Sequence, residues 1–137
     1  MKIVICGSMS FSEKMLEVKK ELESKGHECF VSDFAQQYVG KEEIERNNLV
    51  LFHKNEKNAI IEYWKKIKES DAILVLNYDR KGIKNYIGAN TFLEIGFAYG
   101  FGKKIFFLNQ IPDMPYLKDE LIAVKPIILN GVLENIK

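Results

Sequence analysis

The sequence contains few of the residues that build disulfides, redox sites or metal centres. Its 137 residues include two cysteines and two histidines. Cys6 and Cys29 lack CxxC spacing, and neither stands beside a histidine or an arginine, so we expect buried, reduced thiols. His27 follows a predicted helix end, and His53 has no second histidine or cysteine at ligand spacing. We therefore expect no metal ion.

Long apolar runs and an excess of one charge are also absent. The opening residues, MKIVICGSMS, contain an apolar stretch that is too short for a signal peptide or a membrane span. With 20 basic and 19 acidic residues the net charge is +1, which gives no electrostatic footprint for a nucleic-acid polymer or an anionic membrane. We expect a cytoplasmic protein whose partners are selected by a local site.

The composition is typical of a folded domain. Hydrophobic residues make up 47% of the chain and charged residues 28%. A chain of this length buries a core without disulfides or metals. Because no internal repeat, linker or low-complexity tract interrupts it, we expect a single domain over residues 1–137.

Short apolar runs alternate with helical patterns along the chain. Strands are expected at residues 2–6, 28–31, 72–76, 105–108 and 127–129. Residues 41–52 predict a helix followed by an irregular apolar segment. Strands that are apolar on both faces and alternate with helices indicate a three-layer α/β fold, a parallel sheet with helices on both faces. Right-handed crossovers favour the flavodoxin-like or Rossmann-like strand order 2-1-3-4-5.

A sheet of this order binds ligands at the carboxyl ends of its first and third strands. The turn after the first strand, Gly7, Ser8 and Met9, offers a close backbone approach, a hydroxyl and helix-start N–H groups, which suit a sugar or an anion. A simple strand-to-helix turn is the alternative interpretation. The turn lacks both GxGxxG and GK[ST], which disfavours dinucleotide binding and NTP hydrolysis.

The loop after the third strand and the helix that follows supply the remaining candidates for substrate binding. Tyr78 and Tyr86 are candidates for stacking on a base, and Gly88 allows a ligand to approach the backbone. The other candidates are Asn77, Asp79, Asn90 and Thr91. The expected helix runs over residues 91–102.

Glu94 is the strongest catalytic candidate. Its neighbours in TFLEIGFAY are almost all apolar, which predicts a helix that is buried nearly all round. Burying a carboxylate without partners costs several kcal/mol, so an acid here needs a reason. The alternative is an acid in the first helical turn that the helix dipole stabilises by about 0.3–1 kcal/mol.

Three segments resemble the nucleoside 2-deoxyribosyltransferase family, which includes deoxynucleoside-monophosphate N-glycosidases. They are KIVICGSMS, SDAILVLN and the E-x-G-x-A pattern of Glu94, Gly96 and Ala98. The resemblance covers most of residues 1–110. It implies that Glu94 is the nucleophile that forms a covalent glycosyl-enzyme and that Gly7 and Ser8 contact sugar or phosphate. It also implies no cofactor and a homodimer or a higher homo-oligomer.

The chain departs from that family at three places. The family has an aspartate six residues before the nucleophile, where this chain has Gly88, so Asn77, Asp79 or Asn90 has to substitute. The family's acid that assists the leaving base has its nearest counterpart in Glu62, which is one residue out of register. The first loop contains no arginine, so a free nucleoside fits at least as well as a monophosphate.

The expected function is cleavage or transfer of the N-glycosidic bond of a (deoxy)nucleoside or nucleotide, a small-molecule substrate. Gly88, Thr91 and Glu94 also match the G-x-x-T-x-x-E pattern of phosphoribohydrolases that act on nucleoside monophosphates. The third hypothesis is a non-catalytic nucleotide-binding or sensor domain, which the missing aspartate at Gly88 favours.

Overall fold

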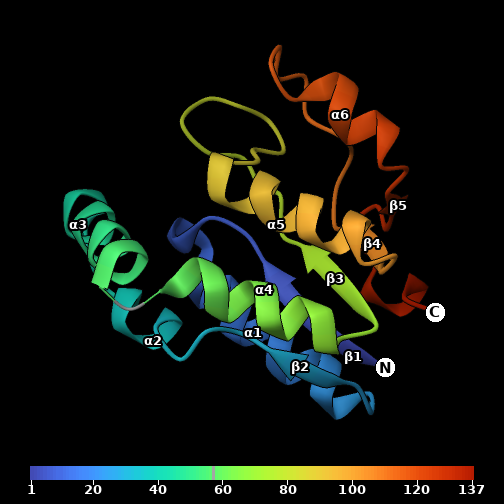
Figure 1. Ribbon diagram of the computed structural model, residues 1–137, viewed down its shortest axis with the longest axis horizontal. Helices are drawn as coiled ribbons and strands as arrows, with labels where there is room; N and C mark the ends of the chain where they lie inside the picture. Colours follow the sequence, from blue (N-terminus) through green and yellow to red (C-terminus); the bar gives the residue numbers. More distant parts are fainter. Residues whose placement is uncertain (57) are drawn as a thin grey trace.

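The computed structural model describes residues 1–56 and 58–137, which contain a five-stranded sheet (Figure 1). Its strands are β1 (Lys2–Cys6), β2 (Glu28–Phe30), β3 (Ala72–Val75), β4 (Lys104–Phe107) and β5 (Ile127–Ile128). They lie in the order β2-β1-β3-β4-β5, and every neighbouring pair is parallel. The strand order and the α/β fold class predicted from the sequence are confirmed.

Helices connect the strands. They are α1 (Ser12–Ser24), α2 (Ala35–Tyr38), α3 (Glu43–Glu56), α4 (Ala59–Glu69), α5 (Ala89–Gly100) and α6 (Lys118–Ala123), with short 3-10 turns η1 (Met9–Phe11) and η2 (Leu133–Asn135). The apolar segment that was expected to be irregular is helical, because α3 continues to Glu56. Among the described residues, no helix combines the length and the apolar character needed to cross a membrane.

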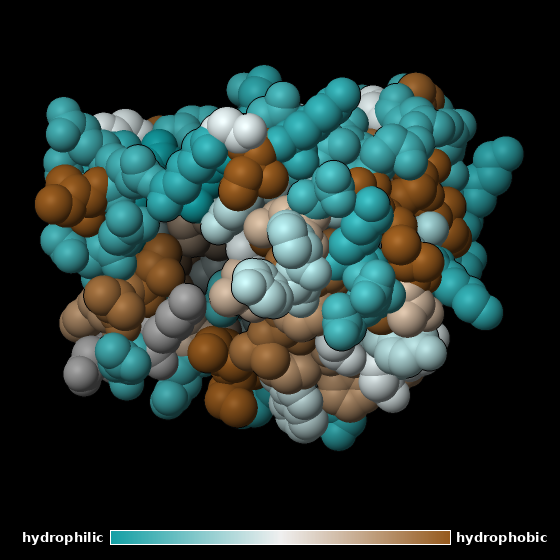
Figure 2. Space-filling view, turned by 90° about the horizontal axis from the view of Figure 1, so that it is seen from above, coloured by the Kyte–Doolittle hydropathy of each residue, from teal (hydrophilic) through white to brown (hydrophobic). Residues whose placement is uncertain are grey.

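The carboxyl ends of β1 and β3 point toward the side of the molecule where α3 and the loop before α5 lie (Figure 1). Figure 2 looks at this region from above and shows a hollow on the left, between the side where α3 lies and the centre of the molecule. α3 therefore lies on the side of the molecule toward which the carboxyl ends of β1 and β3 point.

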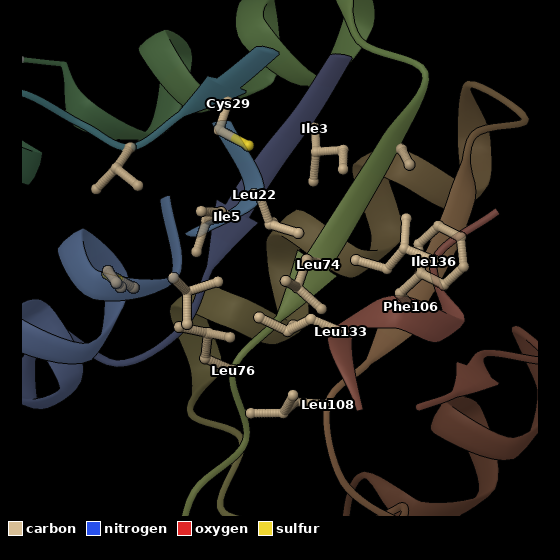
Figure 3. Packing of buried hydrophobic residues seen from close by; sticks show 14 of the residues in the cluster. Ile3, Ile5, Leu22, Cys29, Leu74, Leu76, Phe106, Leu108, Leu133 and Ile136 are labelled. Carbon is tan, nitrogen blue, oxygen red and sulfur yellow. The ribbon is translucent and has the colours of Figure 1, made fainter. Parts of the chain in front are cut away.

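Alternate side chains of the strands build two apolar clusters, one on each face of the sheet. Ile3 and Ile5 of β1 face the cluster under α1, which Figure 3 shows from close by. Val4 and Cys6 face the opposite cluster, under α4 and α5. The first cluster also includes Met15, Leu22, Leu74, Phe106 and Leu133, and the second includes Tyr63, Ile67, Ile73, Ile95 and Phe107. Burial on both faces explains why these strands are continuously apolar.

Two helix starts bear on the candidate site, and one of them differs from the sequence prediction. A 3-10 turn precedes α1, so this helix begins at Ser12. The helix expected from Thr91 begins two residues earlier, at Ala89, after the extended residue Gly88. Glu94 consequently lies in the second turn of α5, and the first turn contains no acidic residue.

Candidate functional site

A cleft of about 180 Å³ opens where β1 and β3 end. Its walls come from the turn after β1, from α3, from the loop before α5 and from the first residues of α5. Of the residues predicted to bind substrate, Gly7, Ser8, Met9, Tyr86, Gly88, Asn90 and Thr91 line this cleft. The sequence did not single out Ser10, Arg46, Asn47, Val50, Arg80 and Ala89, which also line it.

The turn after β1 is shaped by close packing. A Cβ atom on Gly7 would lie 3.1 Å from the Leu76 carbonyl oxygen and 3.2 Å from the Met15 methyl carbon. A glycine is therefore needed for the approach of the turn to the end of β3. The Ser8 hydroxyl oxygen accepts a hydrogen bond from the Ser10 backbone N–H at 3.2 Å, which starts η1. Both serines of this bond line the cleft.

The amino-terminal end of α5 forms the facing wall. Gly88 is extended, with φ −86° and ψ 173°, and a Cβ atom there would lie 3.0 Å from the Tyr86 hydroxyl oxygen. The absent side chain thus gives Tyr86 its place in the cleft. Asn90 and Thr91 belong to the first turn, whose N–H groups have no intrahelical partner and favour an anion nearby.

Arg46, on α3, fixes the cleft wall through three hydrogen bonds. It donates to the Met9 carbonyl at 2.7 Å, to the Lys41 carbonyl at 2.9 Å and to the Glu13 carboxylate at 2.7 Å. The bond from Arg46 is the main reason why the pKa of Glu13 is lowered from its ordinary value. Arg46 therefore links α3 to the turn after β1, through Met9, and to α1, through Glu13.

Arg80 approaches the cleft from the loop before α5. Its Nη2 donates to Glu43 Oε1 at 3.0 Å, and its guanidinium carbon lies 5.2 Å from the centre of the Tyr86 ring. Glu43 also pairs with Lys81 at 3.3 Å. These contacts join the first turn of α3 to the loop before α5, across the cleft.

Glu94 lies deeper in the molecule and is not among the residues that line the cleft. It is 4% exposed and follows Asn90 and Thr91 by one helical turn on the same side of α5. Burial and, secondarily, the charge of Glu94 raise the pKa values of the Cys6 thiol and the Tyr63 hydroxyl. The interpretation of Glu94 as a first-turn acid is wrong, because the helix begins too early for it.

A second, smaller pocket of about 30 Å³ adjoins the cleft and shares Met9, Val50 and Asn90 with it. Tyr38, His53 and Tyr63 line this pocket. The Tyr38 hydroxyl lies 2.6 Å from His53 Nδ1, and burial raises the pKa of Tyr38 to about 12. His53 is 3% exposed and belongs to this buried polar group.

Three candidates from the loop after β3 do not line the cleft. Asn77 is fully buried, and its amide donates to two backbone carbonyls of the segment after β4. The Tyr78 ring packs edge-on against Phe11 at a centroid distance of 5.3 Å. The Asp79 carboxylate accepts the Asn85 backbone N–H at 2.9 Å. In the structure these side chains shape the loop and the end of the sheet.

Glu62, the weaker catalytic candidate, lies in the first turn of α4 and outside the cleft lining. Burial is the main cause that raises its pKa, Asp33 raises it further, and Lys66 opposes the shift. Within residues 1–56 and 58–137, no group of three His, Cys, Asp or Glu side chains is arranged to hold a metal ion.

Comparisons with known proteins show a similarity of fold. No protein-family model matches the chain, and no curated protein matches it in sequence. One similar solved structure is that of a CMP N-glycosidase from Clostridium botulinum, BcmB. The two chains are 22% identical with a TM-score of 0.54, and the match covers 95% of this chain and 90% of the other.

Proposed function

We propose that this protein cleaves the N-glycosidic bond of a nucleoside or nucleotide, with Glu94 as the nucleophile. The observation that carries the proposal is the position of Glu94, a buried carboxylate one helical turn behind the cleft residues Asn90 and Thr91. The sequence resemblance assigns the nucleophile to this residue, and the fold is shared with a CMP N-glycosidase. Its second-turn position also removes the helix dipole as the reason for an acid here.

The proposed reaction has two steps. A carboxylate oxygen of Glu94 bonds to the anomeric carbon while the bond from that carbon to the base nitrogen breaks, through a transition state with oxocarbenium character. The electron pair of the broken bond leaves with the base, which takes up a proton. Water then attacks the anomeric carbon, releases the sugar and restores the carboxylate. Attack by a second base instead of water gives transfer.

The other roles in the proposal follow from the cleft lining. The turn after β1 and the first turn of α5 hold the sugar, because both border the cleft. The first turn of α5 immediately precedes Glu94, and Cys6, the residue before the turn after β1, is close enough to Glu94 for its charge to raise the pKa of the thiol. The base contact goes to Tyr86, which lines the cleft, whereas Tyr78 packs against Phe11. Glu62 has no role in the proposal because it lies on α4, which contributes no residue to the cleft lining, whereas Glu94 lies one turn behind two lining residues of α5.

Base release from a panel of substrates tests the proposal. The panel contains ribonucleosides, deoxynucleosides and their 5′-monophosphates, each with and without a free acceptor base. Wild type is compared with Glu94→Gln, which keeps the shape of the side chain, and with Glu69→Gln, an exposed acid at the amino-terminal edge of the sheet. We expect Glu94→Gln to lower the rate by at least about a thousandfold and Glu69→Gln to retain it.

Mass spectrometry adds a direct readout, since the first step predicts a glycosyl adduct on Glu94 of the wild type alone. Base release that survives in Glu94→Gln, with its circular dichroism spectrum unchanged, refutes the nucleophile assignment. Binding of several panel members without any release of base favours the second candidate, a nucleotide sensor, which Gly88 in place of the aspartate supports. The expected homodimer stays a prediction, which light scattering tests.

A further inference from the structure

The two arginines of the chain, Arg46 and Arg80, both line the cleft, although they come from different segments. The other 18 basic residues are lysines. Arginine presents a planar fork of donors that matches the oxygens of a phosphate, which a lysine ammonium does not. This cleft therefore contains the donor type that suits a phosphate, and it contains both of the chain's arginines.

The two arginines differ in what holds them. Arg46 donates to two backbone carbonyls and to Glu13, so its donors are used to build the cleft wall. Arg80 has its side chain only 15% exposed, and its ion-pair partner Glu43 is 56% exposed. An exposed carboxylate holds a guanidinium weakly, because water competes for the carboxylate oxygens.

The loop presents Arg80 at a fixed backbone position. Arg80 and Ile83 exchange backbone hydrogen bonds of 2.9 and 3.0 Å. Lys81 and Gly82 between them have φ values of 52° and 73°, which is the geometry of a tight type I′ turn. The Tyr86 ring supports the guanidinium from one side. A side chain with a fixed base and a supported head loses little freedom when it binds an anion.

We propose that Arg80 binds the phosphate of a phosphorylated substrate and that Glu43 competes with this phosphate for the guanidinium. The identity of the rest of the substrate rests on the function proposed above. The phosphate lies between Arg80 and the first turn of α5, which adds backbone N–H donors at the same cleft. The arginine that the first loop lacks is thus supplied by the loop after β3.

Binding of ribose 5-phosphate tests this role of Arg80 without any bond to cleave. Calorimetry compares ribose 5-phosphate with ribose on the wild type, Arg80→Ala, Arg80→Lys and Glu43→Gln. Lys81→Ala is the matched control, because it removes a positive charge from the residue next to Arg80. Lys81 also pairs with Glu43, but it lies outside the cleft lining.

The expected results differ between the variants. Arg80→Ala weakens the binding of ribose 5-phosphate by about 10- to 100-fold, the usual cost of losing hydrogen bonds to a charged group. Arg80→Lys restores part of that loss, and Lys81→Ala stays within about twofold of the wild type because its charge is exposed and screened. Glu43→Gln tightens binding by about two- to fivefold, because an exposed competitor has been removed.

Three outcomes overturn the proposal: no binding of ribose 5-phosphate to the wild type, equal losses in Arg80→Ala and Lys81→Ala, or weaker binding in Glu43→Gln. The proposed function fails separately. Absence of base release from the whole panel, together with binding that depends on Arg80, refutes the enzyme and keeps the phosphate site. If the protein releases base and Arg80→Ala changes the rates for nucleosides and for monophosphates by the same factor, the enzyme is kept and the phosphate site is refuted.

Discussion

Replacing Asn77 by alanine tests how the carboxyl end of the sheet is held together. Asn77 is fully buried and lies two residues after the end of β3. Its Nδ2 donates to the carbonyl oxygens of Asn109 and Gln110 at 3.0 Å each, and its Oδ1 accepts the Asn109 backbone N–H at 2.9 Å. These three bonds tie the end of β3 to the segment that follows β4.

The expected cost follows from the number of bonds. Each side-chain hydrogen bond contributes about 0.5–1.5 kcal/mol net, so three contribute about 1.5–4.5 kcal/mol. We expect about 3 kcal/mol, because alanine also leaves buried backbone groups of the segment after β4 without these partners. For a chain of 137 residues, this free energy lowers the melting temperature by about 10–15 °C.

Urea unfolding followed by circular dichroism measures this difference in the free energy of unfolding. The matched control is Asn109→Ala, which removes one side-chain bond, from Asn109 Nδ2 to the Asn77 carbonyl at 3.2 Å. We expect the control to lose about 1 kcal/mol. If Asn77→Ala is as stable as Asn109→Ala, the reasoning is refuted. A variant with wild-type stability that no longer binds ligand would instead support the role in substrate binding that the sequence predicted.

Three further substitutions test Gly7 in the turn after β1, Gly96 on α5 and Glu13 on α1. Gly7→Ala should lower the free energy of unfolding by about 1–3 kcal/mol, because the new Cβ would lie 3.1 Å from the Leu76 carbonyl oxygen. Gly96→Ala, where no atom lies within 4 Å of the new Cβ, should raise it by about 0.5–1 kcal/mol, and urea unfolding compares the two. Glu13→Gln should cost less than about 1 kcal/mol, because the Glu13 side chain is 43% exposed. Since Arg46 lowers the folded pKa of Glu13, this cost should be complete above its ordinary value of 4.5 and vanish as the pH falls through the folded pKa, which unfolding at a series of pH values from 7 downward measures.

The strand order was predictable because each strand carries its own signal. β3 reads Ala-Ile-Leu-Val and is buried on both faces, which a parallel central strand requires. Right-handed crossovers then restrict the topology. The full length of α3 was not predictable, because Ile44, Leu51 and Phe52 are exposed on it by 47% or more. A helix that exposes its apolar residues has no clear apolar stripe in its sequence.

The cleft was partly predictable. Topology alone placed the turn after β1 and the start of α5 at one edge of the sheet, and Ser8 and Asn90 indeed line the cleft there. Asn77 belongs to the same predicted region, but its side chain turns into the sheet end, which the order of residues does not specify. Arg46 reaches the cleft from a helix far along the chain. Only the composition could have pointed to Arg46. Two of the 20 basic residues are arginines, and arginine differs from lysine in presenting a planar fork of donors.

The distribution of charge across the cleft gives the two proposals a common consequence for substrate orientation. Positive charge lies at the rim, on Arg80 and Arg46, and the carboxylate of Glu94 lies behind the first turn of α5. A phosphate is stabilised at the rim, while the positive charge that develops on a sugar during glycosidic cleavage is stabilised near the carboxylate. In the reversed orientation, the phosphate would lie near the Glu94 carboxylate and the positive charge that develops on the sugar would lie near the two arginines, and both arrangements are repulsive. Under the two proposals together, the phosphate would bind at the rim with the anomeric carbon pointing inward, so that Arg80 would act on substrate affinity and orientation and Glu94 on the bond that breaks.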